Sequence, residues 1–267
     1  AKINPADINA IGFGVAGASN QDGRDLVYRR LEYLNIARQT IIINDAEAAY
    51  EINCPGDFGI LVTVGTGIIC IYRDHNGKTI RKAGKGHDLG DIGSGYWIGK
   101  QAIYNLAINE TSVIGDEDLE EIMEGLLQYI NEDNFQAALE HLSDNIESVF
   151  EIANFAEFII QIAQKGNEIA LSVIQEATHA LANYIISLTD EIEYTEKHIV
   201  LAGNGSVIRN DFFRQSLNDE LLFNFTDIKW TFSSISSAYG AGILAARLQN
   251  VEIKISDLIK GNALDAA

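Results

Sequence analysis

One aspartate stands where an α/β protein would place a catalytic carboxylate. Asp45 directly follows the β-branched run 40–43 and precedes residues 46–50, which favour a helix. Ligands of α/β proteins bind at the carboxyl ends of strands, and an aspartate there can take the proton of a hydroxyl that attacks a phosphoryl group. Alternatively, Asp45 is only the N-cap of the following helix, and this single feature leaves the two interpretations equally open.

A glycine turn comes next along the chain. Gly65, Thr66 and Gly67 separate two apolar runs, 59–64 and 68–73, in the pattern of a hairpin. Glycines at such a tip can take positive φ and leave backbone N–H groups uncovered, so the turn could hold a phosphate, with the Thr66 hydroxyl as a further donor. A plain hairpin turn explains the same residues, and short glycine matches are weak signals when taken alone.

A second glycine-rich stretch, 84–97, contains two carboxylates, Asp88 and Asp91. A carboxylate accepts hydrogen bonds at two oxygens, which suits the vicinal hydroxyls of a sugar. The alternative is that Asp91 caps the helix that carries Trp97. Further on, a run predicted as a strand enters the loop Gly203, Asn204, Gly205 and Ser206. Such a loop could admit a nucleotide close to the backbone, or it could be an ordinary turn between strand and helix.

Strands and helices alternate at both ends of the chain and are separated by a long helical stretch. This order predicts an α/β architecture with two lobes and a cleft between them, where ligands usually bind. We expect strands at 11–15, 40–43, 59–64, 68–73, 78–83, 198–202 and 228–232, and helices at 22–34, 46–50, most of 97–193, 211–217 and 236–248. One apolar stripe predicts a buried face on the last long helix: Ile169, Val173, Ala177, Leu181, Ile185, Leu188 and Ile192.

Composition limits the classes of partner. The 267 residues are 47% hydrophobic and 21% charged, as in a globular protein, and the formal net charge of −19 argues against binding to nucleic acid or to an anionic membrane. The longest apolar stretch, 58–72, is too short to span a bilayer, and no targeting segment is recognisable at the N-terminus.

With two cysteines, Cys54 and Cys70, no disulfide framework is expected, and a reducing cytoplasm fits best. The histidines show no metal-ligand spacing, so no protein metal site is predicted.

Taken in order, these motifs resemble those of the N-acetylglucosamine kinases and their relatives in the BadF/BadG/BcrA/BcrD ATPase family, within the actin, Hsp70 and hexokinase superfamily. The resemblance runs from about residue 11 to the C-terminus. It rests on GVAG with Gly14 and Gly17, NDAEAA with Asp45, VGTG at 64–67, GDIGSGYWIG from Gly90 to Gly99, and the helix SSAYGAGILAA.

The resemblance implies two ribonuclease-H-like lobes that close over ATP, Mg²⁺ and an N-acetylhexosamine or related hexose. It places the general base at Asp45. It assigns the sugar contacts to Gly17, Asn44, Gly90 and Asp91, and the nucleotide contacts to Gly65, Thr66, Gly67, Gly203, Asn204, Gly205 and Ser206. It implies no partner beyond the sugar and ATP, and it leaves open whether the chain forms a homodimer.

The chain departs from the family pattern at its beginning. The family's first phosphate motif should precede Ile11 by some fifty residues, and the sequence has nothing there. We therefore expect an incomplete N-terminal lobe, residues 1–56, completed by the C-terminal helix 243–267, and a C-terminal lobe, 57–242, with a helical insert. Ile68, His87 and Ile92 replace the family's usual serine, tryptophan and acidic residue, which bears on the identity of the sugar.

An ATP-dependent sugar kinase is thus the leading interpretation. A non-catalytic sugar-binding or regulatory protein of the same fold is the first alternative, because the first phosphate motif is missing. An ATPase that activates a redox partner is the second, and it ranks lower because Cys54 and Cys70 fall in a turn and a strand.

Overall fold

A computed structural model describes residues 4, 7–15, 18, 21–33, 36–54, 59–74, 76–86, 91–109, 113–144 and 148–258. Two predicted sugar contacts, Gly17 and Gly90, lie outside these residues. The chain forms two compact units. The first comprises residues 1–61, 73–79 and 231–267, and the second comprises residues 62–72 and 80–230.

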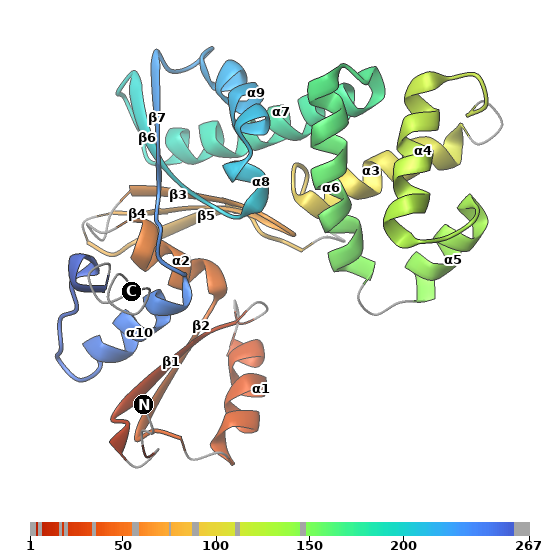
Figure 1. The fold of residues 1–267 in the computed structure, drawn as a ribbon. Coiled ribbons are helices and arrows are strands. Elements are labelled where there is room, and N and C mark those ends of the chain that lie inside the picture. Colours follow the sequence, from red (N-terminus) through yellow and green to blue (C-terminus); the bar gives the residue numbers. More distant parts are fainter. Residues whose placement is uncertain are drawn as a thin grey trace. The chain divides into compact units, whose positions relative to one another are not determined.

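Most of a sheet of five described strands belongs to the second unit (Figure 1). Its strand order is β5-β4-β3-β6-β7. Strands β3, β4 and β5 are joined by short turns, so each is antiparallel to its neighbour, as the sequence predicts. The bounds are β3 Gly59–Val64, β4 Ile68–Arg73, β5 Thr79–Ala83, β6 His198–Asn204 and β7 Asp227–Phe232.

Helices make up the rest of the second unit. Polar side chains start several of them: Ser94 caps α3, Asp116 caps α4, Asn167 caps α7 and Asn210 caps α9. The bounds are α3 Gly95–Ile108, α4 Glu117–Ile130, α5 Phe135–Asp144, α6 Ser148–Lys165, α7 Glu168–Glu191, α8 Ser206–Arg209 and α9 Asp211–Leu221.

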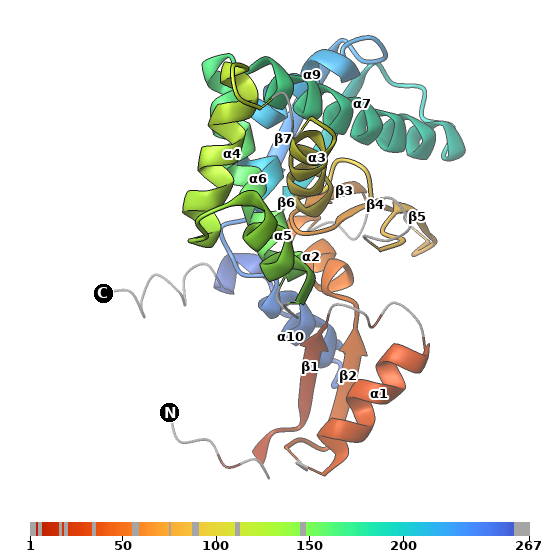
Figure 2. The same cartoon turned by 90° about the vertical axis from the view of Figure 1, so that its right-hand side faces the viewer.

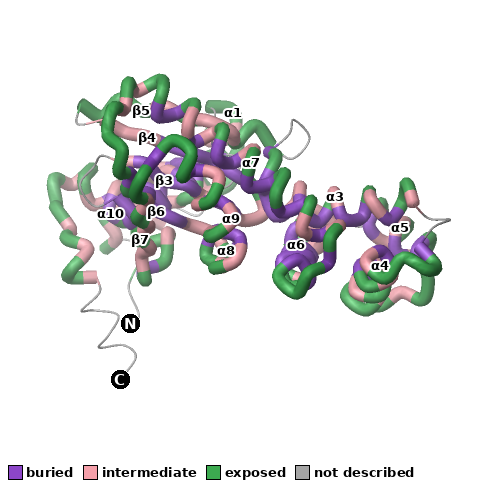
Figure 3. The backbone as a smooth tube through the Cα atoms, turned by 90° about the horizontal axis from the view of Figure 1, so that it is seen from above, coloured by how far each residue is buried: buried purple, intermediate pink, exposed green. Residues whose placement is uncertain are grey.

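Burial follows the apolar faces of these helices. Helix α6 packs on α3 and α7, and α7 packs on α9; in Figure 3 the buried segments lie where α3, α6 and α7 face their neighbours. The predicted stripe on α7 is confirmed through its middle, where Val173, Ala177, Leu181, Ile185 and Leu188 are buried. Its ends, Ile169 and Ile192, are half-buried.

The first unit is built on two parallel strands, β1 Ala10–Gly14 and β2 Gln39–Ile43, with α1 Gln21–Glu32, α2 Asp45–Asn53 and α10 Ala238–Arg247 (Figure 2). Helix α10 packs on β1 and α2. A Cβ added to Gly12 would overlap the carbonyl oxygen of Ala241, and one on Gly240 would overlap that of Ala48. The glycines of the SSAYGAGILAA segment and of β1 therefore permit a close approach of backbones.

The sequence predicts a buried strand at 11–15. The strand is present, but the prediction that it is buried is wrong. Residues 10–13 are half-buried and Gly14 is exposed. Helix α1 in the same unit also has no buried residue among those described, so neither element is part of a closed core.

A buried ion cluster lies in the first unit. Glu51 of α2 is 3% exposed, and its Oε1 accepts a hydrogen bond of 2.7 Å from Arg73 Nη1. Its Oε2 lies 2.8 Å from Arg247 Nη1 of α10 in an ion pair without hydrogen-bond geometry. The Arg73 guanidinium also stacks 4.4 Å from the ring centroid of Tyr50, whose hydroxyl donates to the Gly59 carbonyl at 2.8 Å. The cluster thus ties α2 to the ends of β3, β4 and α10.

None of the helices in the described part of the chain is long and apolar enough to cross a membrane.

Candidate functional site

Hydrogen bonds from the first residues of helix α3 hold the turn between β3 and β4. The N–H of Gly65 donates to the Gly67 carbonyl at 2.9 Å, which closes the turn. The first N–H groups of α3 then donate to the turn, from Gly95 to Gly65 O at 2.7 Å and from Tyr96 to Thr66 O at 3.2 Å. These two bonds satisfy helix donors that would otherwise lack partners, and they hold the turn in place.

Three donors of this turn remain available. Among the described residues, the N–H groups of Thr66 and Gly67 and the hydroxyl of Thr66 have no hydrogen-bond partner. Thr66 is half-buried and Gly67 is exposed. Two neighbouring N–H groups and a hydroxyl on a rigid turn can bind a phosphate oxygen.

The second glycine loop lies against this turn. Gly205 has φ +98°, and a Cβ there would overlap the carbonyl oxygen of Val64 and come within 3.0 Å of the Gly65 nitrogen. Only glycine fits this position, because both the backbone conformation and the space exclude a side chain. Two motifs 140 residues apart in the sequence thus form one surface.

The loop predicted at 203–206 is shorter than expected. Gly203 and Asn204 are the last residues of β6, only Gly205 forms the turn, and Ser206 begins α8. Strand β6 thus runs beyond its apolar segment beside β3, and the Asn204 side chain donates from Nδ2 to the Thr63 hydroxyl of that strand at 3.4 Å.

Asp91 also belongs to this surface. It is 6% exposed; its Oδ1 accepts from the Lys85 N–H at 2.9 Å, and its Oδ2 lies 3.7 Å from where a Cβ of Gly67 would be. Ser94 caps α3, its hydroxyl accepting from Trp97 N at 3.1 Å, so the alternative that Asp91 is the helix cap is wrong. Burial raises the pKa of the nearby Tyr184 phenol, and the negative charge of Asp91 raises it further.

Asp45 is the first residue of α2 and is exposed. Its neighbour Asn44 caps the helix, with Oδ1 accepting from Ala46 N at 2.9 Å, while Glu47 Oε2 accepts from Asn44 N at 2.9 Å. This reciprocal capping box makes the N-cap interpretation of Asp45 wrong. Glu47 is also 3.2 Å from Arg24 Nη2, which steadies the turn. Asp45 Oδ1 also accepts from Ala46 N, at 3.0 Å, so Asp45 shares this donor with Asn44 without being the cap.

The structure thus brings together the residues predicted for the phosphates, Gly65 to Gly67 and Gly205 with Ser206, and one predicted for the sugar, Asp91. All of these lie in the second unit, whereas Asn44 and Asp45 lie in the first.

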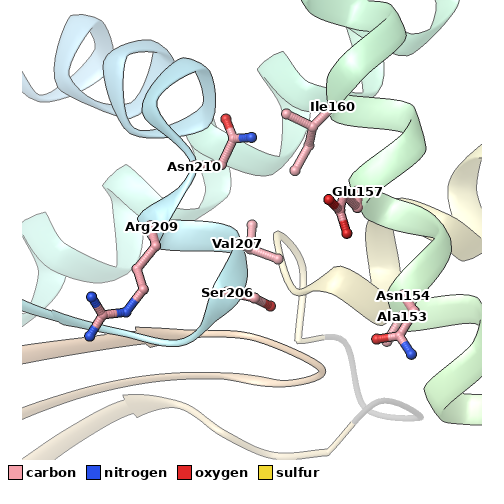
Figure 4. Close-up of a pocket in the computed structure, with 8 residues that line it drawn as sticks. All are labelled: Ala153, Asn154, Glu157, Ile160, Ser206, Val207, Arg209 and Asn210. Carbon is pink, nitrogen blue, oxygen red and sulfur yellow. The ribbon is translucent and has the colours of Figure 1, made fainter. Parts of the chain in front are cut away.

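A pocket of about 340 Å³ opens beside Ser206, between α6 and α8 (Figure 4). Helix α6 provides one wall with Ala153, Asn154, Glu157 and Ile160, and the other wall is Ser206, Val207, Arg209 and Asn210. Its volume is at the lower end of the range of small-molecule sites.

The comparisons with known proteins agree on one family. The pattern of the BadF/BadG/BcrA/BcrD ATPase family matches residues 1–245. The chain belongs to this family. It is 29% identical over 245 residues to an N-acetylmuramic acid/N-acetylglucosamine kinase of Clostridium acetobutylicum, covering 90% of this chain and 78% of that protein. An N-acetyl-D-glucosamine kinase of Dictyostelium discoideum is 24% identical over 89% of this chain and 75% of its own length.

Solved structures show the same fold. A provisionally named N-acetylglucosamine kinase of Chromobacterium violaceum superposes with a TM-score of 0.68 at 19% identity, over 91% of this chain and 78% of that one. A hexokinase of Schistosoma mansoni gives a TM-score of 0.53 at 13% identity, over 84% and 61%. The predicted family and the α/β fold of the actin and hexokinase type are therefore confirmed.

The sequence left an ATPase that activates a redox partner as the second alternative. Here both cysteines are buried, and burial raises the pKa of the Cys54 and Cys70 thiols to about 12. Cluster ligands must be thiolates that can reach the metal. These two thiols do not fit an iron–sulfur cluster.

No three His, Cys, Asp or Glu side chains gather as a metal site within the described residues. Among the described residues, Asp91 places a carboxylate next to the turn at Gly65 to Gly67, with Oδ2 3.7 Å from where a Cβ of Gly67 would be. Magnesium in nucleotide sites is commonly held by one or two carboxylates together with phosphate oxygens. The residues present therefore fit a magnesium ion that arrives with a nucleotide.

Sequence reasoning missed the α6 side of the pocket in this BadF-family chain. Asn154, Glu157 and Gln161 follow one another at three- and four-residue spacing and are exposed, and this spacing is a sequence signal for a polar face of α6.

Proposed function

We propose that this protein is an ATP-dependent sugar kinase that phosphorylates an N-acetylhexosamine or a related hexose. One observation carries the proposal: the turn at Gly65 to Gly67, with donors that have no described partner, lies against Gly205 at the mouth of a pocket. A nucleotide could place its phosphates on the turn and its nucleoside in the pocket. The names of the relatives support the same activity.

In this proposal the phosphates of ATP accept hydrogen bonds from the N–H groups of Thr66 and Gly67 and from the Thr66 hydroxyl. Gly203, Asn204, Gly205 and Ser206 border the nucleoside. Asp91 and phosphate oxygens would hold Mg²⁺ or, as the family resemblance implies, Asp91 would accept from sugar hydroxyls. Magnesium, when bound, would neutralise the charge that develops on the phosphate oxygens.

Asp45 is the proposed general base. Its carboxylate takes the proton of the acceptor hydroxyl as that oxygen bonds to the γ-phosphorus, and the bond from phosphorus to the β-γ bridging oxygen breaks to release ADP. Asn44, Gly17 and Gly90 would complete the sugar contacts. Because Asn44 already caps α2, its first contribution is to fix the turn that carries the base.

The proposed base belongs to the first unit, and the turn at Gly65 to Gly67 belongs to the second. We propose residues 1–56 with 243–267 as an incomplete N-terminal lobe and 57–242 as the C-terminal lobe. The half-buried strand β1 and the unburied helix α1 support the incompleteness. Limited proteolysis that cuts near residue 57 would support this boundary, whereas cuts near 62 and 230 would favour the division by contacts.

A panel of sugars tests the activity. The purified protein is mixed with ATP, Mg²⁺ and each sugar, and ADP is measured by a coupled assay. We expect ADP release that depends on an N-acetylhexosamine or a related hexose. The absence of sugar-dependent release across the panel would refute the proposal, and calorimetry that shows sugar binding without affinity for ATP would point to a sugar-binding protein instead.

A further inference from the structure

Glu157 is a carboxylate on the pocket wall that nothing in the described structure engages. It is exposed on α6, and Figure 4 shows its carboxylate pointing into the space between α6 and α8. No described residue forms a hydrogen bond or an ion pair with it. Its neighbour on the same face, Asn154, is in contrast already hydrogen-bonded to Tyr129.

The position of Glu157 relative to the phosphate turn follows from contacts at the start of α3. A Cβ on Gly95 would lie 2.9 Å from Gly65 O, 3.0 Å from Ala153 O and 3.5 Å from Val207 Cγ2. Ala153 therefore lies at the end of the pocket nearest the phosphate turn. At 1.5 Å of rise per residue, Glu157 is about 6 Å and Ile160 about 10 Å further along the helix.

This order matches the order of the parts of a nucleotide. Beyond the phosphates comes the ribose, and beyond the ribose comes the base. Along the pocket wall, Glu157 lies nearer to the phosphate turn than the buried side chain of Ile160 does. Val207 lines the facing wall.

We infer that Glu157 selects ribonucleotides by accepting hydrogen bonds from the 2′- and 3′-hydroxyls of the ribose. An ionised carboxylate is an acceptor only, and its two oxygens suit two neighbouring hydroxyl donors. Hydrogen bonds to a charged acceptor are about twice as strong as those between neutral groups, so the loss of one hydroxyl is costly. This assignment rests on the proposed use of ATP and deepens it.

Nucleotide binding tests the assignment without any turnover. Calorimetry on the whole protein measures the Kd of ATP and of 2′-deoxyATP with Mg²⁺. The unaltered protein should bind 2′-deoxyATP about tenfold more weakly, because one charge-assisted hydrogen bond is lost. Glu157→Ala should weaken ATP more than 2′-deoxyATP, so that the preference between them disappears.

Two further variants make the result decisive. Glu157→Gln keeps an acceptor oxygen without the charge and should retain part of the preference. Glu176→Gln removes the same charge from an exposed position of α7 outside the pocket and should leave both Kd values unchanged. Circular dichroism checks that each variant is folded, which is expected because both side chains are exposed.

The outcomes separate two failures. If the unaltered protein binds both nucleotides equally, or if Glu157→Ala weakens both by the same factor, the role of Glu157 is wrong while nucleotide binding stands. If the unaltered protein binds neither nucleotide, the proposed kinase function fails, and the assignment of Glu157 fails with it.

Discussion

Replacement of Asp45 by asparagine separates its proposed role as general base from the folding of α2, because the cap of this helix is the adjacent residue, Asn44. Asn44 is the cap of α2, with its Oδ1 accepting from Ala46 N and the Glu47 carboxylate accepting from Asn44 N. Asp45 Oδ1 also accepts from Ala46 N, at 3.0 Å, and an asparagine oxygen at position 45 can do the same. Asp45→Asn keeps the shape of the side chain and removes its basicity. Asn44→Ala removes the cap and keeps the base.

Asp45→Asn should mainly lower kcat, whereas Asn44→Ala should mainly lower stability. Loss of a general base lowers kcat by about 10²- to 10⁴-fold, which corresponds to about 3–5 kcal/mol in the barrier. The loss of one exposed charge at the first turn of a helix costs stability by less than about 1 kcal/mol. Loss of the Asn44 cap costs about 0.5–2 kcal/mol, or roughly 2–4 °C in Tm for each kcal/mol.

The assay combines steady-state kinetics of ADP release with thermal unfolding of the same samples. Asp45→Asn should lower kcat steeply while KM for the sugar and Tm stay nearly constant. Glu168→Gln is the matched control, because Glu168 is the exposed first residue of α7 behind another asparagine cap, Asn167. It should leave kcat unchanged. A kcat for Asp45→Asn within about threefold of the unaltered protein would refute the role of Asp45 as base.

Three other predictions concern single features of the fold. Gly205→Ala should destabilise the protein by more than about 1 kcal/mol in urea unfolding and weaken ATP binding, because φ is +98° and the β3 backbone occupies the Cβ position; unchanged stability would contradict the observed contact. Arg73→Met should cost about 3 kcal/mol, because it leaves the buried Glu51 with one ion pair, whereas a loss below 1 kcal/mol would mean that the cluster contributes little. Iodoacetamide should label Cys54 and Cys70 slowly up to about pH 10 in the folded protein and quickly in urea. Burial raises the pKa of both thiols to about 12, so the reactive thiolate appears only above that pH range, and rapid labelling of the folded protein at pH 8 would contradict this.

The sheet was well predicted from sequence wherever apolar runs are bounded by strong turn formers. Both strands of the hairpin, 59–64 and 68–73, have the predicted limits, because Gly65 and Gly67 stop each run sharply. Strand β6 instead runs two residues past its apolar segment. These last residues lie beside β3, with the Asn204 side chain bonded to the Thr63 hydroxyl, and a neighbouring strand is not visible in a single segment.

The helix caps show a second limit of sequence reasoning. Asparagine, aspartate and serine are all preferred at the N-cap of a helix, so the sequence cannot decide between them where two stand close together, as at 44–45 and 91–94. The backbone conformation decides between them: Asn44 and Ser94 both have the extended φ and ψ of a cap, which leaves Asp45 and Asp91 for other roles. The choice matters because neither candidate site carboxylate is the cap of its helix, although each accepts a backbone N–H, Asp45 from Ala46 and Asp91 from Lys85.

The α6 wall of the pocket could not be predicted, because it depends on packing between segments about fifty residues apart. Residues 152–153 of α6 pack against Gly95 and Gly99 of α3, and this contact sets which side of α6 faces α8. Sequence periodicity shows only that the helix has an apolar face.

Helix α3 affects how the phosphate turn can work. A glycine-rich segment before a helix suggests that the helix N-terminus itself binds phosphate. Here the first N–H groups of α3 donate to the carbonyls of Gly65 and Thr66, so they are not available to a ligand. An anion would meet the N–H groups of the turn, and the helix would stabilise the turn from behind. Substitutions that loosen the start of α3, such as Ser94→Ala, should therefore weaken nucleotide binding without removing any direct contact, and ATP affinity equal to that of the unaltered protein would show that the turn keeps its shape unaided.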